Sequence, residues 1–133
     1  MSMLIDHLGI AVADLNKAVK QYCNHFGYSL QLEEDIPDQK VKAAFLNLAE
    51  NTIELLQPAS EESPLYNFIK KRGGGLHHIC YRVSDIAAEL KRLKECGYLV
   101  IDNEPRPGSR NTLIAFIHPK SSGGVLIELC QKL

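Results

Sequence analysis

The feature that most constrains this chain is an internal repeat. Residues 5–15 return in similar form as residues 76–86. Three positions recur unchanged at an offset of 71 residues, so that His7, Val12 and Asp14 become His78, Val83 and Asp85. Each copy later closes on an apolar strand with one carboxylate, Glu54 in the first and Glu128 in the second. A repeat this short cannot bury its own apolar face, so it must pack against its copy.

Both copies predict the same order of elements. In the first, Asp14 caps a helix that Gly27 ends, and strands are expected at 4–12, 28–34, 40–48 and 51–57. In the second, Asp85 and Gly97 bound the helix, a loop surrounds Pro105, Pro107 and Gly108, and the later strands are expected at 98–102, 112–117 and 124–130. A linker helix lies between the copies, begins after Ser63 and stops at Gly73-Gly74-Gly75.

The fold class that follows is α+β. It consists of two tandem βαβββ modules, at about 3–58 and 75–131, which are related by a pseudo-two-fold and together form one domain over residues 1–133. The two modules should form a curved mixed sheet around a shared cleft.

Composition excludes several classes of protein. The net charge of −1 argues against a nucleic-acid binder, which normally carries a basic excess. No apolar run reaches membrane-spanning length and no signal peptide is evident, so we expect a cytoplasmic protein. The four cysteines lack paired spacing and are expected to be reduced and mostly buried: Cys23, Cys80, Cys96 and Cys130.

Each module also offers one histidine and one glutamate. His7 and His78 lie on the strand face opposite the apolar residues that pack on the helices. Glu54 and Glu128 alternate with apolar neighbours, where a carboxylate is costly unless it is solvated, paired or bound to a cation. The pseudo-two-fold brings all four toward one centre. The sequence therefore predicts a divalent metal site, and cobalt, nickel, manganese and zinc all suit this set of donors.

A plainer interpretation exists for each residue taken alone. A single strand histidine or glutamate is more often structural, and only the match at corresponding repeat positions favours ligands. His77 replaces Asp6 of the first copy and is interpreted as structural, or as a residue that supports a ligand, rather than as a ligand itself. Cys80 shares the face of His78, where it could line the cavity, and is interpreted as a small buried apolar residue. The basic end of the linker helix, Lys70-Lys71-Arg72, is expected to be solvated.

Four segments of the sequence, at 6–12, 54–58, 75–79 and 118–129, resemble the vicinal oxygen chelate superfamily and, within it, its methylmalonyl-CoA epimerase branch. The resemblance implies that His7, His78 and Glu128 bind a metal ion and that Glu54 is the fourth ligand. It implies interconversion of (R)- and (S)-methylmalonyl-CoA through a metal-stabilised enolate, with Glu128 as one acid/base group. Glu54, its symmetry mate, is nominated as the second. The branch often forms homodimers, so a homodimer that takes a small acyl-CoA substrate is expected.

Two positions depart from the branch. Some epimerases have glutamine where this chain has Glu54, and the His-Glu-His-Glu set also resembles glyoxalase I. Some epimerases carry a second catalytic glutamate on the preceding strand, but residues 41–45 contain no carboxylate. If Glu54 is only a ligand, Lys42 and a metal-bound water are the next candidates. The alternative functions are a lactoylglutathione lyase and a drug-binding member of the superfamily that has no activity.

The cationic clusters suggest where an acyl-CoA would bind. Coenzyme A carries several phosphates, and the chain offers the linker end Lys70-Lys71-Arg72 together with Arg106 and Arg110. Some of these side chains are expected to contact the phosphates.

Overall fold

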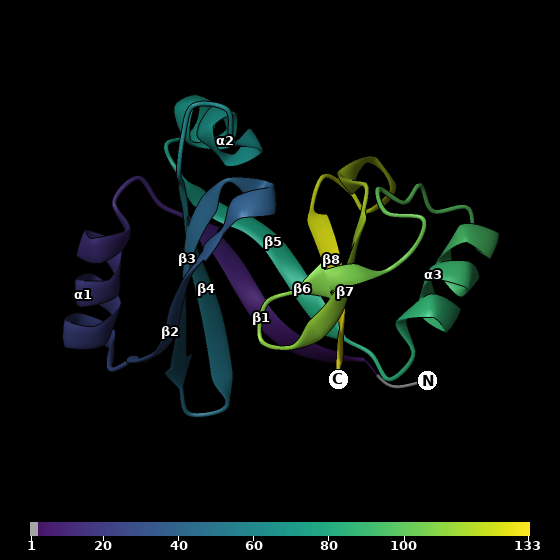
Figure 1. Ribbon diagram of the computed structural model, residues 1–133, viewed down its shortest axis with the longest axis horizontal. Coiled ribbons are helices and arrows are strands. Elements are labelled where there is room, and N and C mark those ends of the chain that lie inside the picture. The colour runs from purple at the N-terminus through teal and green to yellow at the C-terminus, as the bar shows by residue number, and fades with distance from the viewer. Residues whose placement is uncertain (1–2) are drawn as a thin grey trace. The chain divides into compact units, whose positions relative to one another are not determined.

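The computed structural model describes residues 3–133 and contains two compact units (Figure 1). One unit is formed by residues 7–77, and the other by residues 3–6 together with residues 78–133. The division falls inside two strands, between Asp6 and His7 and between His77 and His78. Among residues 3–133, no helix is long and apolar enough to cross a membrane.

The first unit contains the elements of the first repeat and the linker helix. They are β1 (Leu4–Ala11), α1 (Leu15–Phe26), β2 (Ser29–Ile36), a 3-10 turn (Pro37–Gln39), β3 (Val41–Leu48), β4 (Asn51–Pro58) and α2 (Pro64–Arg72). The strand order is β2-β3-β4-β1, with β1 parallel to β4 and the other neighbours antiparallel. The predicted order of elements is therefore confirmed for the first module.

Helix α1 covers one face of this sheet. The Asp14 side chain accepts a hydrogen bond from the Lys17 amide at 3.1 Å, and Gly27 ends the helix with a left-handed φ of 78°. The apolar side of the helix packs on β3 and β4 in a core of Leu15, Ala18, Ala44, Leu46, Ile53 and Leu55. Residues Leu8, Ile10 and Val12 join this core, as their alternation predicts.

The opposite face of the sheet is partly covered by α2. The Ser63 hydroxyl caps this helix by accepting from the Leu65 amide at 3.3 Å. The helix packs on a second cluster made of Ala11, Val41, Ala43, Leu56 and Leu65. We call the face that carries this cluster the inner face, and the α1 side the outer face. Gly74 then passes so close to the chain that a Cβ there would lie 2.8 Å from the carbonyl oxygen of Ala11.

The second unit repeats the plan. Its elements are β5 (Gly75–Arg82), α3 (Ile86–Glu95), β6 (Arg106–Gly108), β7 (Thr112–Ile117), a 3-10 turn (Pro119–Ser121) and β8 (Leu126–Lys132). The strand order is β5-β8-β7-β6, with β5 parallel to β8. Asp85 caps α3, and the helix packs on a core of Val83, Ile86, Leu90, Ala115, Ile117 and Leu129.

The prediction of a strand at 98–102 is wrong. This segment makes only one isolated bridge, between Val100 and Ile117. The Phe116 amide, which could have continued the pairing, donates its hydrogen bond to the Asp102 carboxylate instead. The short strand β6 pairs with β7 instead. The sequence predicted a loop around Pro107. Proline is tolerated in an edge strand, because no further strand needs a hydrogen bond from the N–H that proline lacks.

Strand β2 contains an irregularity that changes which face its residues occupy. Leu30 pairs with Leu46, and after a register shift Leu32 pairs with Phe45. Leu46 belongs to the outer core, whereas Phe45 stacks edge-on against His7 at a ring-centroid distance of 5.6 Å. Residues 32, 34 and 36 therefore lie on the inner face, although regular alternation from Leu30 would put them on the outer face.

A glutamine joins the last strand of each module to its helix. The Gln57 Oε1 atom accepts a hydrogen bond from the Leu15 amide at 2.7 Å, and the Gln131 Oε1 atom accepts one from the Ile86 amide at 2.9 Å. Each bond satisfies a first-turn amide that has no partner inside its own helix. Because each glutamine stands three residues after Glu54 or Glu128, the same bond is built into both repeats.

Candidate metal centre

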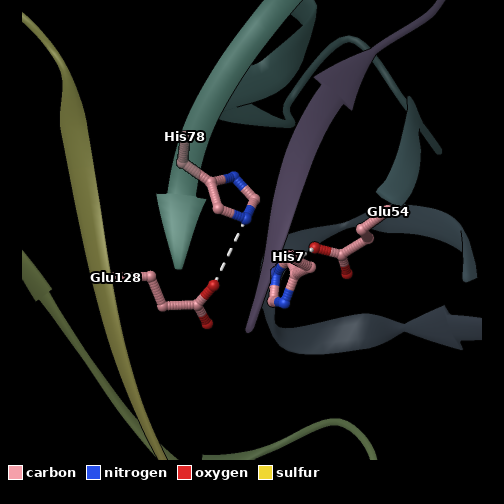
Figure 2. Close-up of side chains that lie close together, drawn as sticks. All are labelled: His7, Glu54, His78 and Glu128. Atoms are coloured by element: carbon pink, nitrogen blue, oxygen red, sulfur yellow. Dashed lines mark ion pairs between the residues drawn. The ribbon is translucent and has the colours of Figure 1, made fainter. Parts of the chain in front are cut away.

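The first unit holds a buried His–Glu pair on its inner face. His7 on β1 and Glu54 on β4 come from neighbouring parallel strands, in which Glu54 pairs with Gly9. The Nε2 atom of His7 lies 3.2 Å from the Oε1 atom of Glu54, and the two residues are only 4% and 5% exposed (Figure 2). The sequence prediction that His7 and Glu54 share a face is confirmed.

The second unit holds the corresponding pair. His78 on β5 and Glu128 on β8 again come from parallel neighbours, and Nε2 lies 3.2 Å from Oε1 (Figure 2). The two residues are 3% and 7% exposed. The His78 ring meets Phe116 edge-on at 6.2 Å, as His7 meets Phe45 in the first unit. The repeat of the sequence is thus a repeat of side-chain geometry.

Each pair is well suited to hold a cation. A buried carboxylate costs several kcal/mol unless a positive charge faces it, and its imidazole partner supplies one only when it is protonated. A divalent cation offsets the carboxylate charge and leaves the imidazole neutral, which is the form that binds metals. Imidazole nitrogen and carboxylate oxygen together suit borderline and hard divalent ions. Both pairs therefore fit metal binding by the chemistry of their donors.

Two buried thiols lie beside the second pair. Cys80 and Cys130 lie on β5 and β8, and both are nearly inaccessible to solvent. The hydrogen bond with Cys130, followed by burial, raises the pKa of the Cys80 thiol far above its ordinary value. With its pKa raised in this way, the thiol is protonated and acts as a buried apolar residue, as the sequence predicted.

The cysteine prediction is correct only in part. Within residues 3–133, all four cysteines are free of disulfides, as expected. Cys80 and Cys130 are buried, but Cys23 is intermediate and Cys96 is exposed. Cys96 lies at the end of α3, where the helix leaves the core.

Sequence reasoning missed a charged cluster around Asp6. The Asp6 side chain is 2% exposed and forms ion pairs with Arg110, with Arg82 at 3.4 Å and with Lys132 at 3.8 Å. Arg82 and Lys132 lie on β5 and β8, four residues beyond His78 and Glu128. The partners are far apart in sequence, so no local pattern could have identified them.

The remaining predicted residues lie outside the two pairs. His77 packs edge-on against Phe68 of α2 at 5.1 Å, which agrees with a structural role. Lys70, Lys71 and Arg72 are exposed at the end of α2, and the Arg72 guanidinium lies over the Phe68 ring at 5.1 Å. Arg106 and Arg110 already have carboxylate partners in Asp102 and Asp6.

Comparison with known proteins identifies the family. A model of the glyoxalase/bleomycin resistance protein/dioxygenase superfamily matches residues 6–116. This chain belongs to that superfamily. An ethylmalonyl-CoA/methylmalonyl-CoA epimerase of Cereibacter sphaeroides is 43% identical over 129 residues, which cover 96% of each chain.

Solved structures of this superfamily share the fold. A methylmalonyl-CoA epimerase from Mycobacterium tuberculosis has a TM-score of 0.93 and 41% identity, covering 97% of this chain and 87% of its own. A methylmalonyl-CoA epimerase in complex with methylmalonyl-CoA and NH4+ has a TM-score of 0.91 and 34% identity, covering 96% and 93%. The expected vicinal oxygen chelate fold is confirmed.

Proposed function

We propose that this chain is a divalent-metal-dependent epimerase that interconverts (R)- and (S)-methylmalonyl-CoA. The observation that carries the proposal is the buried His–Glu pair of each module, His7 with Glu54 and His78 with Glu128. It occurs in a chain that is 43% identical, over 96% of its length, to an acyl-CoA epimerase. The 34% identical epimerase structure with bound methylmalonyl-CoA supports the choice of an acyl-CoA substrate.

The four residues would hold one metal ion together. Each pair contributes one nitrogen and one oxygen, so the complete set is two imidazoles and two carboxylates. The two negative charges would balance one divalent cation. Cobalt is the first choice, and nickel, manganese or zinc also fit this donor set. Bound there, the ion would supply positive charge to stabilise the oxygen that becomes negative when the substrate loses its α-proton.

The chain must also move a proton on two sides of the substrate. Inversion at the α-carbon requires removal of the proton from one face and delivery of a proton to the other. Glu128 is proposed for one side, and Glu54, its symmetry mate, is the candidate in the ligand set for the other. A carboxylate that binds a metal is a weaker base, so either group would have to loosen from the ion before it accepts a proton.

The exposed cations at the end of α2 are proposed to contact the coenzyme A phosphates. Among residues 3–133, Lys70, Lys71 and Arg72 form no ion pair with a carboxylate, unlike Arg106 and Arg110. Such contacts would be made equally in the ground state and the transition state. Neutralising the three side chains should raise KM and leave kcat nearly unchanged in steady-state assays. Loss confined to kcat would oppose this assignment.

The proposed activity is tested by proton exchange. The protein with added cobalt is incubated with methylmalonyl-CoA in deuterated water, and incorporation of deuterium at the α-carbon is followed together with the change of configuration. An epimerase should catalyse both. Absence of both reactions, with turnover of the hemithioacetal of methylglyoxal and glutathione, would instead identify a lactoylglutathione lyase. Drug binding without either turnover would identify a sequestering protein.

Two further properties complete the proposal. A homodimer is proposed because members of this superfamily branch often pair. A cytoplasmic location is proposed because the four cysteines are spaced and placed as reduced thiols rather than as disulfide partners.

A further inference from the structure

We propose that Glu34 on β2 supplies the second acid/base group of the epimerase. This inference rests on the proposed function, because it assumes a reaction in which two groups serve opposite faces of one α-carbon. It removes the difficulty that both nominated carboxylates, Glu54 and Glu128, are also metal ligands. A carboxylate beside the metal centre, and outside its ligand set, would remain a full-strength base.

The strand next to Glu54 cannot provide this group. Its inward positions are apolar, with Ala43 opposite Leu56 and Phe45 opposite Glu54. Lys42, the candidate considered from the sequence, lies on the other side of the sheet. It pairs with Gln57, whose side chain bonds the first amide of α1, so Lys42 belongs to the outer face.

The next strand along provides a carboxylate on the correct face. Glu34 pairs directly with Ala43, and cross-strand partners lie on the same face of a sheet. The register shift between Leu30 and Leu32 is what brings Glu34 to this face. Bulges of this kind recur beside active sites, where they redirect a side chain.

The side chain of Glu34 on β2 is longer than that of its neighbour Ala43 on β3, which lies between it and the strand of Glu54. Ala43 has only a methyl group, so its own side chain does not extend as far from the sheet as that of Glu34. With strands about 4.8 Å apart and about 3.4 Å per residue, two strands and two residues separate the Cα atoms of Glu34 and Glu54 by about 12 Å. Glu34 therefore shares the inner face with Glu54 but is too far from it to be a ligand of the same ion.

One carboxylate oxygen of Glu34 is buried without a hydrogen-bond partner in the described part of the chain, which needs an explanation. Its Oε1 atom is buried and has no hydrogen-bond partner among residues 3–133. The neighbouring acids Glu33 and Asp35 are exposed, as expected for charges on an edge strand. A buried carboxylate oxygen that makes no hydrogen bond destabilises the fold, because it has lost its water without gaining a partner. Such an atom in a native fold calls for an explanation, and a lone pair reserved for a substrate proton is one.

The step balances without a redox partner. One carboxylate takes the α-proton while the C–H electron pair enters the enolate. The carboxylic acid on the opposite face then gives a proton to the same carbon, and the two groups exchange roles in the reverse direction. Glu128 and Glu34 are assigned to these two roles, and Glu54 is a ligand only.

The test compares Glu34→Gln with the matched control Glu33→Gln, whose side chain is exposed on the outer face. Epimerisation is measured together with solvent deuterium exchange of each separate enantiomer, and metal content and melting temperature are recorded. Glu34→Gln should keep its fold and metal, lose epimerisation about 100-fold or more, and still exchange the α-proton of one enantiomer. Glu33→Gln should behave as the wild-type protein.

Each other outcome is decisive. An active wild type with Glu34→Gln epimerising within about threefold of it would overturn the role of Glu34 and leave the proposed function intact. Loss of exchange with both enantiomers, in a folded and metal-loaded variant, would also overturn it. A wild type that neither exchanges nor epimerises methylmalonyl-CoA would overturn the proposed function and this inference with it. Should Glu34→Gln unfold, Glu34→Asp is assayed in its place: it keeps the carboxylate but shortens it, and unchanged epimerisation would count against the assignment.

Discussion

At the scale of single residues, the burial of two strand carboxylates carries a desolvation cost. Glu54 and Glu128 are 5% and 7% exposed, and each has an imidazole nitrogen 3.2 Å away. The cost of removing a carboxylate from water is offset only by a charge or by hydrogen bonds nearby. Function explains why the sequence retains such residues, because apolar side chains would be more stable in those strands.

Removal of one imidazole should separate metal binding from folding. We expect His7→Ala and His78→Ala each to lose bound divalent ion and activity. Even residues that only support a ligand cost about 10–100-fold in metal affinity, and loss of a ligand should cost at least that. The matched control is His77→Ala, whose ring packs on Phe68 outside the pairs. Stoichiometric metal in the His7→Ala/His78→Ala double variant, by elemental analysis, would refute the site.

Asp6 is a third buried carboxylate, and its loss should lower the free energy of unfolding. Asp6→Asn would leave Arg110, Arg82 and Lys132 without their shared carboxylate. Arg82 and Lys132 are 44% and 43% exposed and can be solvated, so the cost should come mainly from Arg110, which is only 16% exposed. A buried polar group left without its partner costs about 1–3 kcal/mol, and urea unfolding should show a loss of that order. The control is Glu62→Gln, which removes the exposed pair between Lys40 and Glu62 and should cost about 1 kcal/mol or less. Equal midpoints for the two variants would show that the Asp6 cluster adds no more than a surface ion pair.

At the scale of elements, each module ties its last strand to its helix through one glutamine. The bonds from the Leu15 amide to Gln57 and from the Ile86 amide to Gln131 occupy equivalent places. They fix the end of the strand that carries Glu54 or Glu128 against the start of the module's own helix. The position of each carboxylate therefore depends on a contact that lies three residues away on the opposite face.

Loss of either glutamine should weaken its module. Gln57→Ala and Gln131→Ala each remove a hydrogen bond and leave a helix amide without its partner, so each should lower the free energy of unfolding by about 1 kcal/mol. Gln21→Ala, on the exposed surface of α1, should change it by less than about 0.5 kcal/mol. Chemical denaturation measures all three. Indistinguishable values for Gln21→Ala and Gln131→Ala would show that the bond adds nothing to stability.

At the scale of the whole molecule, the proposed ligand set is divided between the two compact units. His7 and Glu54 belong to one, and His78 and Glu128 to the other. Neither unit holds more than two of the four proposed ligands. If one ion binds all four, metal binding must couple the stability of the two units, because the unfolded chain has no preformed site.

Metal removal should therefore lower the melting temperature of the entire chain. A ligand that binds only the folded protein adds about 2.7 kcal/mol at 100 times its Kd. Calorimetry of the chelator-treated protein should show a lower Tm that added cobalt restores, and the His7→Ala/His78→Ala variant should not respond. A Tm that is the same with and without metal in the wild-type protein would contradict a shared site.

The sequence by itself determined the modules and the ligand candidates. Capping by Asp14, the stop at Gly27 and the alternation in β1 act within a few residues, so they can be recognised locally, and the repeat relates His7 and Glu54 to His78 and Glu128. Only the tertiary structure decided which strand pairs beside β7, which face Glu34 occupies after the shift in β2, and which cations surround Asp6. The physical reason is that these outcomes depend on pairing between distant segments. Asp6 and Arg110 are 104 residues apart, and a shift of one residue moves a side chain to the other face of a sheet.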